Sequence, residues 1–207
     1  MIKPMRVKQL ASAMLALLLV GTAQLSVAAG DPTAVVRDTA ERVLSSLRTD
    51  RARYQDDQAL FQLVREVVFP RIDQERTAQW VLGANWRTAT PAQREQFINE
   101  FSDLLLRTYG TALRQYDSEK LNYLPTQAAA GADRVTVRTE IIRPDGPKVS
   151  VDYLLTNRSG EWKVYDIIIE NVSMVVTYRS EYAAIIKRDG MDGLLKQLAE
   201  RNRSVNS

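Results

Sequence analysis

The sequence predicts an α+β fold in which helices pack on one face of a curved four-stranded antiparallel sheet. Two observations lead to this prediction. Apolar residues recur at three- and four-residue steps in the first half of the chain, as in amphipathic helices, and at two-residue steps between about residues 121 and 170, as in strands. Turn-forming residues separate the period-two segments, which favours a meander of hairpins. Helices segregated from an antiparallel sheet are typical of the α+β class.

Three helices are expected first, over residues 32–48, 57–68 and 71–82. In each of them the apolar residues fall near one face, so each should bury one side. The second should end at Phe69-Pro70, because a residue before proline avoids helical geometry. The third should end near Gly83.

The fourth helix has the clearest start. Thr90 is a favourable N-cap, Pro91 suits the first helical position, and Gln93 can complete a capping box with Thr90. Apolar residues then recur at helical spacing from Phe97 to Leu113. The sequence therefore predicts a long helix with one strongly apolar face.

Strands follow, and two more helices close the chain. The four strands should form an antiparallel meander over residues 121–129, 135–141, 149–155 and 161–170. The closing helices are expected over residues 174–190 and 194–198. No linker-like stretch or internal repeat interrupts the chain after the first 30 residues. We therefore expect a single domain over residues 30–207.

Residues 1–29 have the composition of a secretory signal peptide. A basic start is followed by an apolar run of eleven residues from Leu10 to Val20 and then by small residues. This run is too short for a membrane-spanning helix, which needs about 20 apolar residues. We therefore expect cleavage after Ala28 or Ala29 and an exported, periplasmic mature protein.

Composition excludes several classes of function. The 207 residues include no His and no Cys, which removes His-based triads, Cys nucleophiles and thiolate zinc sites, and we expect neither a metal nor a cofactor. Of the 28 basic residues, three lie in residues 1–29, so the mature chain carries 25 basic and 25 acidic residues. We therefore expect no nucleic-acid partner, because proteins that bind nucleic acids usually carry an excess of basic residues.

Asp166 offers an alternative function. It lies among apolar residues of the last strand, where burial raises the pKa of a carboxyl group and can make it a catalytic base. An exported small-molecule enzyme with a cone-shaped α+β fold would use it in this way. No second acid or base can be placed beside it, which favours a structural role. An adaptor protein with a filled core is a third interpretation.

Two segments are more specific than a general α+β pattern. The first reads WVLGANWR at residues 80–87 and TPAQREQF at residues 90–97. The second reads WKVYDI at residues 162–167, ENVSMV at residues 170–175 and YRSEY at residues 178–182. These segments resemble the MlaC-like periplasmic phospholipid-shuttle family, also called the toluene-tolerance auxiliary family. Asn171 stands where the family usually has Gly.

The resemblance implies a lipid carrier of the Gram-negative periplasm rather than an enzyme. Family members hold the acyl chains of a phospholipid between the curved sheet and the helices. The implied partners are the phospholipid ligand, an outer-membrane lipoprotein–porin complex and an inner-membrane ABC transporter with an MCE domain. Transfer between these complexes maintains the lipid asymmetry of the outer membrane and solvent tolerance.

A lipid slot would be lined by the inward faces of the fourth helix, the sheet and the 174–190 helix. An error of one residue in strand register would exchange its members. The predicted lipid-binding residues are Phe101, Leu105, Tyr109, Val137, Val151, Tyr153, Val164 and Val175.

Overall fold

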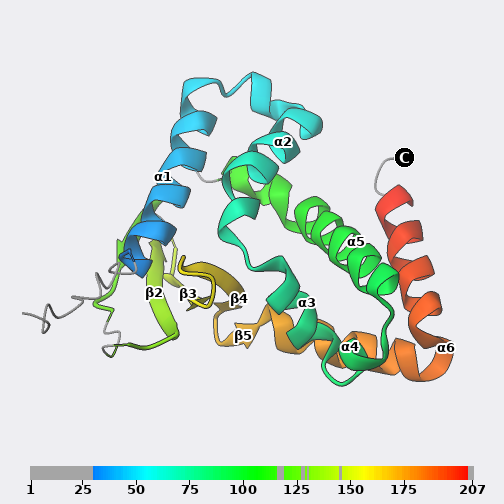
Figure 1. Cartoon of the computed structure of the whole chain (residues 1–207). Helices are drawn as coiled ribbons and strands as arrows, with labels where there is room; N and C mark the ends of the chain where they lie inside the picture. The colour runs from blue at the N-terminus through cyan, green and yellow to red at the C-terminus, as the bar shows by residue number, and fades with distance from the viewer. Residues whose placement is uncertain (1–29, 116–118, 127–128, 130, 145, 205–207) are drawn as a thin grey trace, which may run out of the picture.

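The protein combines helices with an open antiparallel sheet, which confirms the α+β prediction (Figure 1). The computed structural model describes residues 30–115, 119–126, 129, 131–144 and 146–204. The expected signal peptide at residues 1–29 lies outside the described residues. The α-helices are α1 (Pro32–Thr49), α2 (Asp57–Val67), α3 (Gln74–Leu82), α4 (Asn85–Thr88), α5 (Pro91–Tyr109) and α6 (Met174–Ser204). Among the described residues, short 3₁₀-helices are η2 (Arg53–Gln55), η3 (Phe69–Arg71) and η4 (Gly110–Gln115).

The sheet is a meander in which each strand pairs antiparallel with the next. Its strands are β1 (Lys120–Tyr123), β2 (Arg134–Ile142), β3 (Val149–Thr156), β4 (Lys163–Ile169) and β5 (Val172–Ser173), in that spatial order. Four strands were expected, so β5 is a correction. The first strand is also shorter than expected, because Pro125 has no N–H to donate to a ladder.

A tight turn between β4 and β5 explains the fifth strand. Glu170 and Asn171 both have positive φ, 48° and 66°, and Ile169 pairs with Val172 across them. This is the backbone of a two-residue hairpin, in which glycine or asparagine is favoured. Asn171 therefore supplies the conformation for which the resembling family usually has Gly.

The helix boundaries confirm the local sequence signals, with one correction. Thr90 and Gln93 form the capping box that opens α5. The third helix begins at Gln74 rather than residue 71, because Ile72 is extended and bridges to Val164 of β4. The two expected closing helices are the two halves of α6, and they are separated as expected at Gly190, whose φ of 74° and ψ of 179° are not helical.

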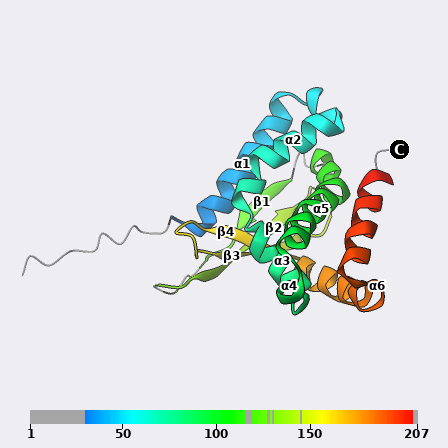
Figure 2. The same ribbon diagram turned by 45° about the vertical axis from the view of Figure 1, so that its right-hand side comes forward.

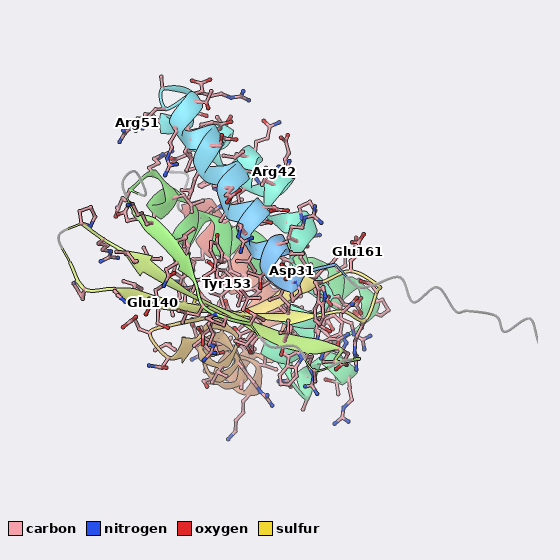
Figure 3. All side chains as sticks on the ribbon, turned by 90° about the vertical axis from the view of Figure 1, so that its left-hand side faces the viewer. Asp31, Arg42, Arg51, Glu140, Tyr153 and Glu161 are labelled. Carbon is pink, nitrogen blue, oxygen red and sulfur yellow. The ribbon has the colours of Figure 1, made fainter. Side chains whose placement is uncertain are left out.

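Helix α1 connects the sheet to the helical part of the molecule. Val36 near its start belongs to the apolar cluster on the sheet, whereas Val43 and Leu47 pack with α2. Figure 2 shows α1 rising from the sheet toward α2, and Figure 3 follows it from Asp31 at the sheet to Arg51 at the far end. One helix thus contributes to both layers.

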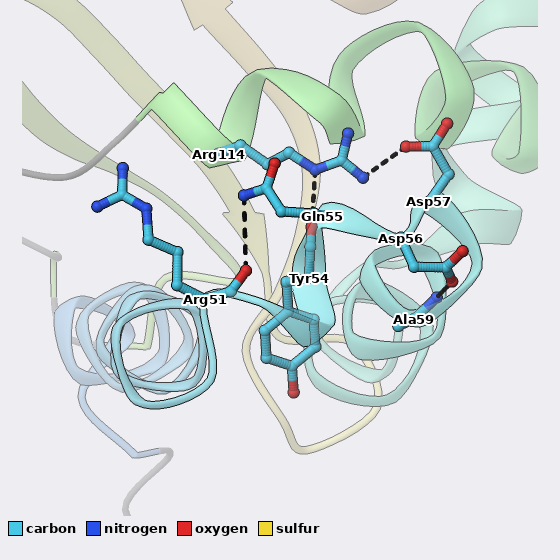
Figure 4. Close-up of polar contacts among 7 residues, drawn as sticks. All are labelled: Arg51, Tyr54, Gln55, Asp56, Asp57, Ala59 and Arg114. Carbon is cyan, nitrogen blue, oxygen red and sulfur yellow. Dashed lines mark hydrogen bonds and ion pairs between the residues drawn. The ribbon is translucent and has the colours of Figure 1, made fainter.

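Arg114 ties η4 to the beginning of α2. Its Nε donates to the carbonyl oxygen of Tyr54 at 2.7 Å, and its guanidinium pairs with the Asp57 carboxylate (Figure 4). Asp56 caps the same helix by accepting from the backbone N–H of Ala59 at 2.8 Å. The segment that follows α5 is therefore fixed to α2 before the chain enters the sheet.

Candidate functional site

One face of the sheet is largely apolar. Along β2 the buried residues are Val135, Val137, Thr139 and Ile141, and they alternate with residues that are more exposed. The register places Val137 opposite Tyr153 of β3. This face is the natural lining for an apolar ligand, because period-two alternation separates it from the charged outer face.

Three of the predicted lipid-binding residues lie together on this face. Val137, Tyr153 and Val164 belong to a single apolar cluster, which we call the sheet cluster. Its buried members are Val36, Val135, Val137, Leu155, Trp162 and Val164, and Val35, Ile72, Tyr123, Tyr153 and Ile167 pack against them partly buried. Within the described part of the chain, helices contribute to it only through α1, since Ile72 precedes α3.

Three other predicted residues lie in a separate helical cluster. Phe101, Leu105 and Val175 belong to a core formed by α3, α5 and α6. Phe101 is 4% exposed; it stacks on Phe97, with ring centroids 5.4 Å apart, and meets Tyr178 edge-on at 5.0 Å. The structure therefore divides these six predicted residues between two apolar clusters.

The sheet cluster and the helices α2 and α5 do not share one core. Leu60, Leu63 and Val67 of α2 pack with α1, and Phe61 and Val64 pack with Leu106 of α5. In the ranges that the structure describes, neither α2 nor α5 contributes a residue to the sheet cluster. The principal helical contacts of the sheet are instead α1 on β2 and α3 and α6 on β4. Among the described residues, the buried apolar side chains thus form separate clusters rather than one joined interior.

The two remaining predicted residues differ in exposure. Val151 is 5% exposed on β3, and its carbonyl oxygen accepts from the hydroxyl of Thr139 at 2.9 Å. Tyr109 is 45% exposed at the end of α5, with its hydroxyl 3.4 Å from that of Tyr178. Burial, and then this contact with Tyr109, raises the pKa of Tyr178. Tyr109 is thus the accessible end of a pair of phenols.

The sequence prediction missed several side chains beside the sheet cluster. Tyr123 follows from strand alternation, since it lies on β1 and is partly buried there. Ile167 does not, because it is three residues from Val164 on β4, and the two share one face only through the register shift in the pairing of β3 with β4. Val35 could be found from the apolar stripe of α1. Ile72 had no local signal, because it precedes α3 and reaches the sheet only through its bridge to Val164.

Asp166 has a structural role in this geometry. One carboxylate oxygen accepts from the backbone N–H groups of Ile167 at 2.8 Å and Val175 at 3.1 Å, and the other accepts from the hydroxyl of Ser173 at 2.6 Å. The carboxylate therefore caps the start of α6 and fixes the β5 turn. Both oxygens are engaged by donors, which does not favour the alternative of a catalytic base.

A pocket outside the predicted slot lies between the two halves of α6. Its volume is about 270 Å³, and Tyr182, Ile185, Leu194 and Leu198 form its apolar part. This is below the range of about 300–1,000 Å³ that is usual for small-molecule sites, and it is too small for two acyl chains. Among the described residues no cluster of His, Cys, Asp and Glu could hold a metal ion, and no helix is long and apolar enough to span a membrane.

The fold and the site define an α+β protein with an open antiparallel sheet and with separate buried apolar clusters on the sheet and among the helices. The chain belongs to the MlaC protein family, whose sequence profile matches residues 37–200. It is similar to a solved phospholipid-binding protein from Ralstonia solanacearum in complex with a phospholipid. The two are 36% identical with a TM-score of 0.80, over 86% of this chain and 100% of that one.

Two curated relatives are also similar over most of their length. The toluene tolerance protein ttg2D of Pseudomonas putida is 28% identical over 170 residues, which is 81% of this chain and 79% of the relative. The intermembrane phospholipid transport system binding protein MlaC of Haemophilus influenzae is 26% identical over 179 residues, which is 84% of each chain.

Proposed function

We propose that this protein is a phospholipid carrier and not an enzyme. The observation that supports this most directly is the similarity, at 36% identity over 86% of this chain, to a phospholipid-binding protein solved in complex with a phospholipid. Its relatives are named for phospholipid binding and transport, which agrees with this role. The eight predicted residues, from Phe101 to Val175, remain our candidates for contact with the acyl chains.

The energetics favour transfer between membranes rather than storage. Burying about 30 methylene groups of a phospholipid, at about 0.8 kcal/mol each, gives roughly 24 kcal/mol relative to water. This exceeds the strongest known non-covalent affinities of about 18–21 kcal/mol, so water is not the relevant reference. The bilayer is equally apolar, and a carrier needs only to match it. Release then requires a partner that receives the lipid directly.

We propose the following cellular setting. The chain is exported to the periplasm by the signal peptide at residues 1–29, and residues 30–207 form the phospholipid-binding domain. It exchanges lipid with an outer-membrane lipoprotein–porin complex and with an inner-membrane ABC transporter that carries an MCE domain. Exchange of this kind maintains outer-membrane lipid asymmetry. The absence of His and Cys and the balanced charge of the mature chain agree with a binding protein.

Lipid analysis of the purified protein tests the proposal. The mature protein, expressed in a bacterial host and purified without detergent, should contain phospholipid at a near-stoichiometric level. Solvent extraction, phosphate analysis and mass spectrometry measure the amount and the lipid class. A protein that carries only trace phosphate after mild purification contradicts the carrier function.

A further inference from the structure

Arg76 is a buried cation that the proposed acyl-chain site does not use. It lies in the first turn of α3 and is only 8% exposed. Its guanidinium carbon is 5.2 Å from the centre of the Tyr165 ring, and its Nε is buried without a hydrogen-bond acceptor among the described residues. A buried charged donor without an acceptor is costly, so binding of a ligand that supplies an acceptor would be favourable.

The nearest acidic residues along α3 are engaged elsewhere. Asp73 caps the helix by accepting from the backbone N–H of Arg76 at 3.0 Å. Glu75 accepts from the side-chain amide of Gln79 at 3.2 Å. Within the part of the chain that the structure describes, no carboxylate lies within 4.0 Å of the Arg76 guanidinium. Its charge is therefore available to an anion.

Arg76 lies between a residue that packs against the sheet cluster and a residue that is exposed to solvent. Ile72, one helical turn earlier in the chain, packs against the sheet cluster. Trp80, one turn later, is 41% exposed and stacks on Tyr165, with ring centroids 6.1 Å apart. Tyrosine and tryptophan are favoured where an apolar region meets a polar one. The guanidinium thus lies between an apolar surface and solvent.

We infer that Arg76, with Tyr165 and Trp80, forms a binding site for a phosphate group. A guanidinium presents its N–H donors in a planar fork that matches two phosphate oxygens, and stacking on an aromatic ring fixes its orientation. This inference rests on the proposed function: the phosphate belongs to the headgroup of a phospholipid, and the acyl chains of that phospholipid extend toward the sheet cluster. Inorganic phosphate offers the same chemistry and is the other source.

Arg94 provides a matched control. Its guanidinium also lies over an aromatic ring, 5.0 Å from the centre of Trp86. Unlike Arg76, it has acceptors: its Nε donates to the carbonyl oxygen of Trp86 at 2.9 Å, and a terminal nitrogen donates to that of Arg87 at 3.4 Å. Replacing Arg94 removes an arginine–aromatic contact without removing an available cation.

The experiment compares ligands with and without phosphate. Delipidated wild type, Arg76→Met and Arg94→Met are incubated with vesicles containing phosphatidylglycerol or a diacylglycerol with the same acyl chains, and lipid uptake is measured. Equilibrium dialysis with inorganic phosphate is the second arm. Arg76→Met should lower uptake of phosphatidylglycerol about tenfold, as loss of a charge-assisted hydrogen bond does, and leave diacylglycerol unchanged. Arg94→Met should change neither.

The outcomes distinguish headgroup phosphate from inorganic phosphate, and they test the phosphate site separately from the carrier function. Selective loss of phospholipid uptake in Arg76→Met supports the headgroup, and loss of inorganic phosphate binding alone supports free phosphate. An Arg76→Met protein that matches the wild type in both arms overturns the inference. Failure of the wild type to take up either lipid contradicts the carrier function instead, and the dialysis arm still decides the phosphate site.

A second variant covers the case in which Arg76→Met does not fold, as judged by circular dichroism. Arg76→Lys keeps the charge but loses the planar fork, so it should reduce phosphate binding by a smaller factor. Wild-type protein that takes up diacylglycerol as readily as phosphatidylglycerol and does not bind inorganic phosphate overturns the inference without any variant.

Discussion

At the scale of single residues, Asp166 illustrates how a side chain with catalytic chemistry can be structural. Its oxygens accept from three donors where β4, β5 and α6 meet. Replacing Asp166 with Ala leaves the buried N–H group of Val175 without its acceptor, and it removes a helix cap. The free energy of unfolding should therefore fall by about 2–4 kcal/mol. Urea denaturation measures the change.

The lipid content distinguishes this structural role from a functional one. The folded fraction of the Asp166→Ala variant should retain as much phospholipid as the wild type. Asp166→Asn is the milder control, because its amide oxygen can still accept from the backbone N–H groups. Loss of lipid at unchanged stability would contradict a capping role.

Val151 tests whether the sheet face lines a slot. A buried, unpaired carboxylate in a filled core costs several kcal/mol, a large part of the stability of a typical domain. In a slot that admits water once lipid has left, the cost is much smaller. Val151→Glu should therefore give a folded, lipid-free protein, which circular dichroism and lipid extraction would detect.

The control for Val151→Glu lies on the opposite face of the sheet. Thr136 is exposed on β2, so Thr136→Glu adds the same charge outside the proposed slot and should leave lipid content unchanged. Unfolding of Val151→Glu, with Thr136→Glu still folded, would favour a filled core around Val151.

At the scale of elements, the bend in α6 shapes the helical core. The first half of α6 starts at the sheet, and the second half returns Leu194 and Leu198 to the core with α5. Asn202 then donates to the carbonyl oxygen of Glu100 on α5 at 2.9 Å. The combination of φ and ψ at Gly190 is open almost only to glycine. A single glycine thus allows one helix to contact both layers.

Replacing Gly190 with Ala should therefore destabilise the protein. No atom lies within 4 Å of an added Cβ, so the cost is conformational, about 1–3 kcal/mol. Thermal or urea unfolding measures it. Gly146→Ala is the matched control, since an added Cβ there meets only ordinary contacts with Arg143 and its φ is not positive. Equal stability of the two variants would mean that α6 can rearrange at Gly190.

At the scale of the whole molecule, charge is balanced both overall and locally. Residues 30–207 include 25 basic and 25 acidic residues. Three basic residues of α6 are paired with acidic residues of the same helix. Arg188 contacts Asp189 at 2.7 Å, Lys196 approaches Glu200 at 4.0 Å, and Arg201 approaches Glu181 at 3.7 Å. Non-specific attraction to anionic lipid should therefore be weak.

This balance predicts how lipid is delivered. Transfer of a fluorescent phospholipid to bare anionic vesicles should be slow and only weakly dependent on salt, because screening has little net charge to act on. The cognate transporter domain should accelerate transfer greatly through specific docking. Stopped-flow fluorescence with and without that domain measures both rates. Fast, strongly salt-dependent delivery to protein-free vesicles would show that membrane electrostatics controls release.

The sequence by itself determined the local structure. The capping box at Thr90, the alternation along β2 and the apolar stripes of the helices depend on neighbouring residues, and each is present where expected. The fold class and the resemblance to the MlaC family followed from these patterns and from two motifs. Such signals are local, because periodicity depends on residues a few positions apart and indicates only which face of an element is apolar.

Only the tertiary structure decided which surface each apolar face meets. Phe101 and Val137 are both apolar at the expected spacing, yet one lies in the α3–α5–α6 core and the other on the sheet. Ile72 reaches the sheet through a bridge to a strand about 90 residues later in the chain. Periodicity carries no information about such partners, because burial depends on which distant segments come together when the chain folds.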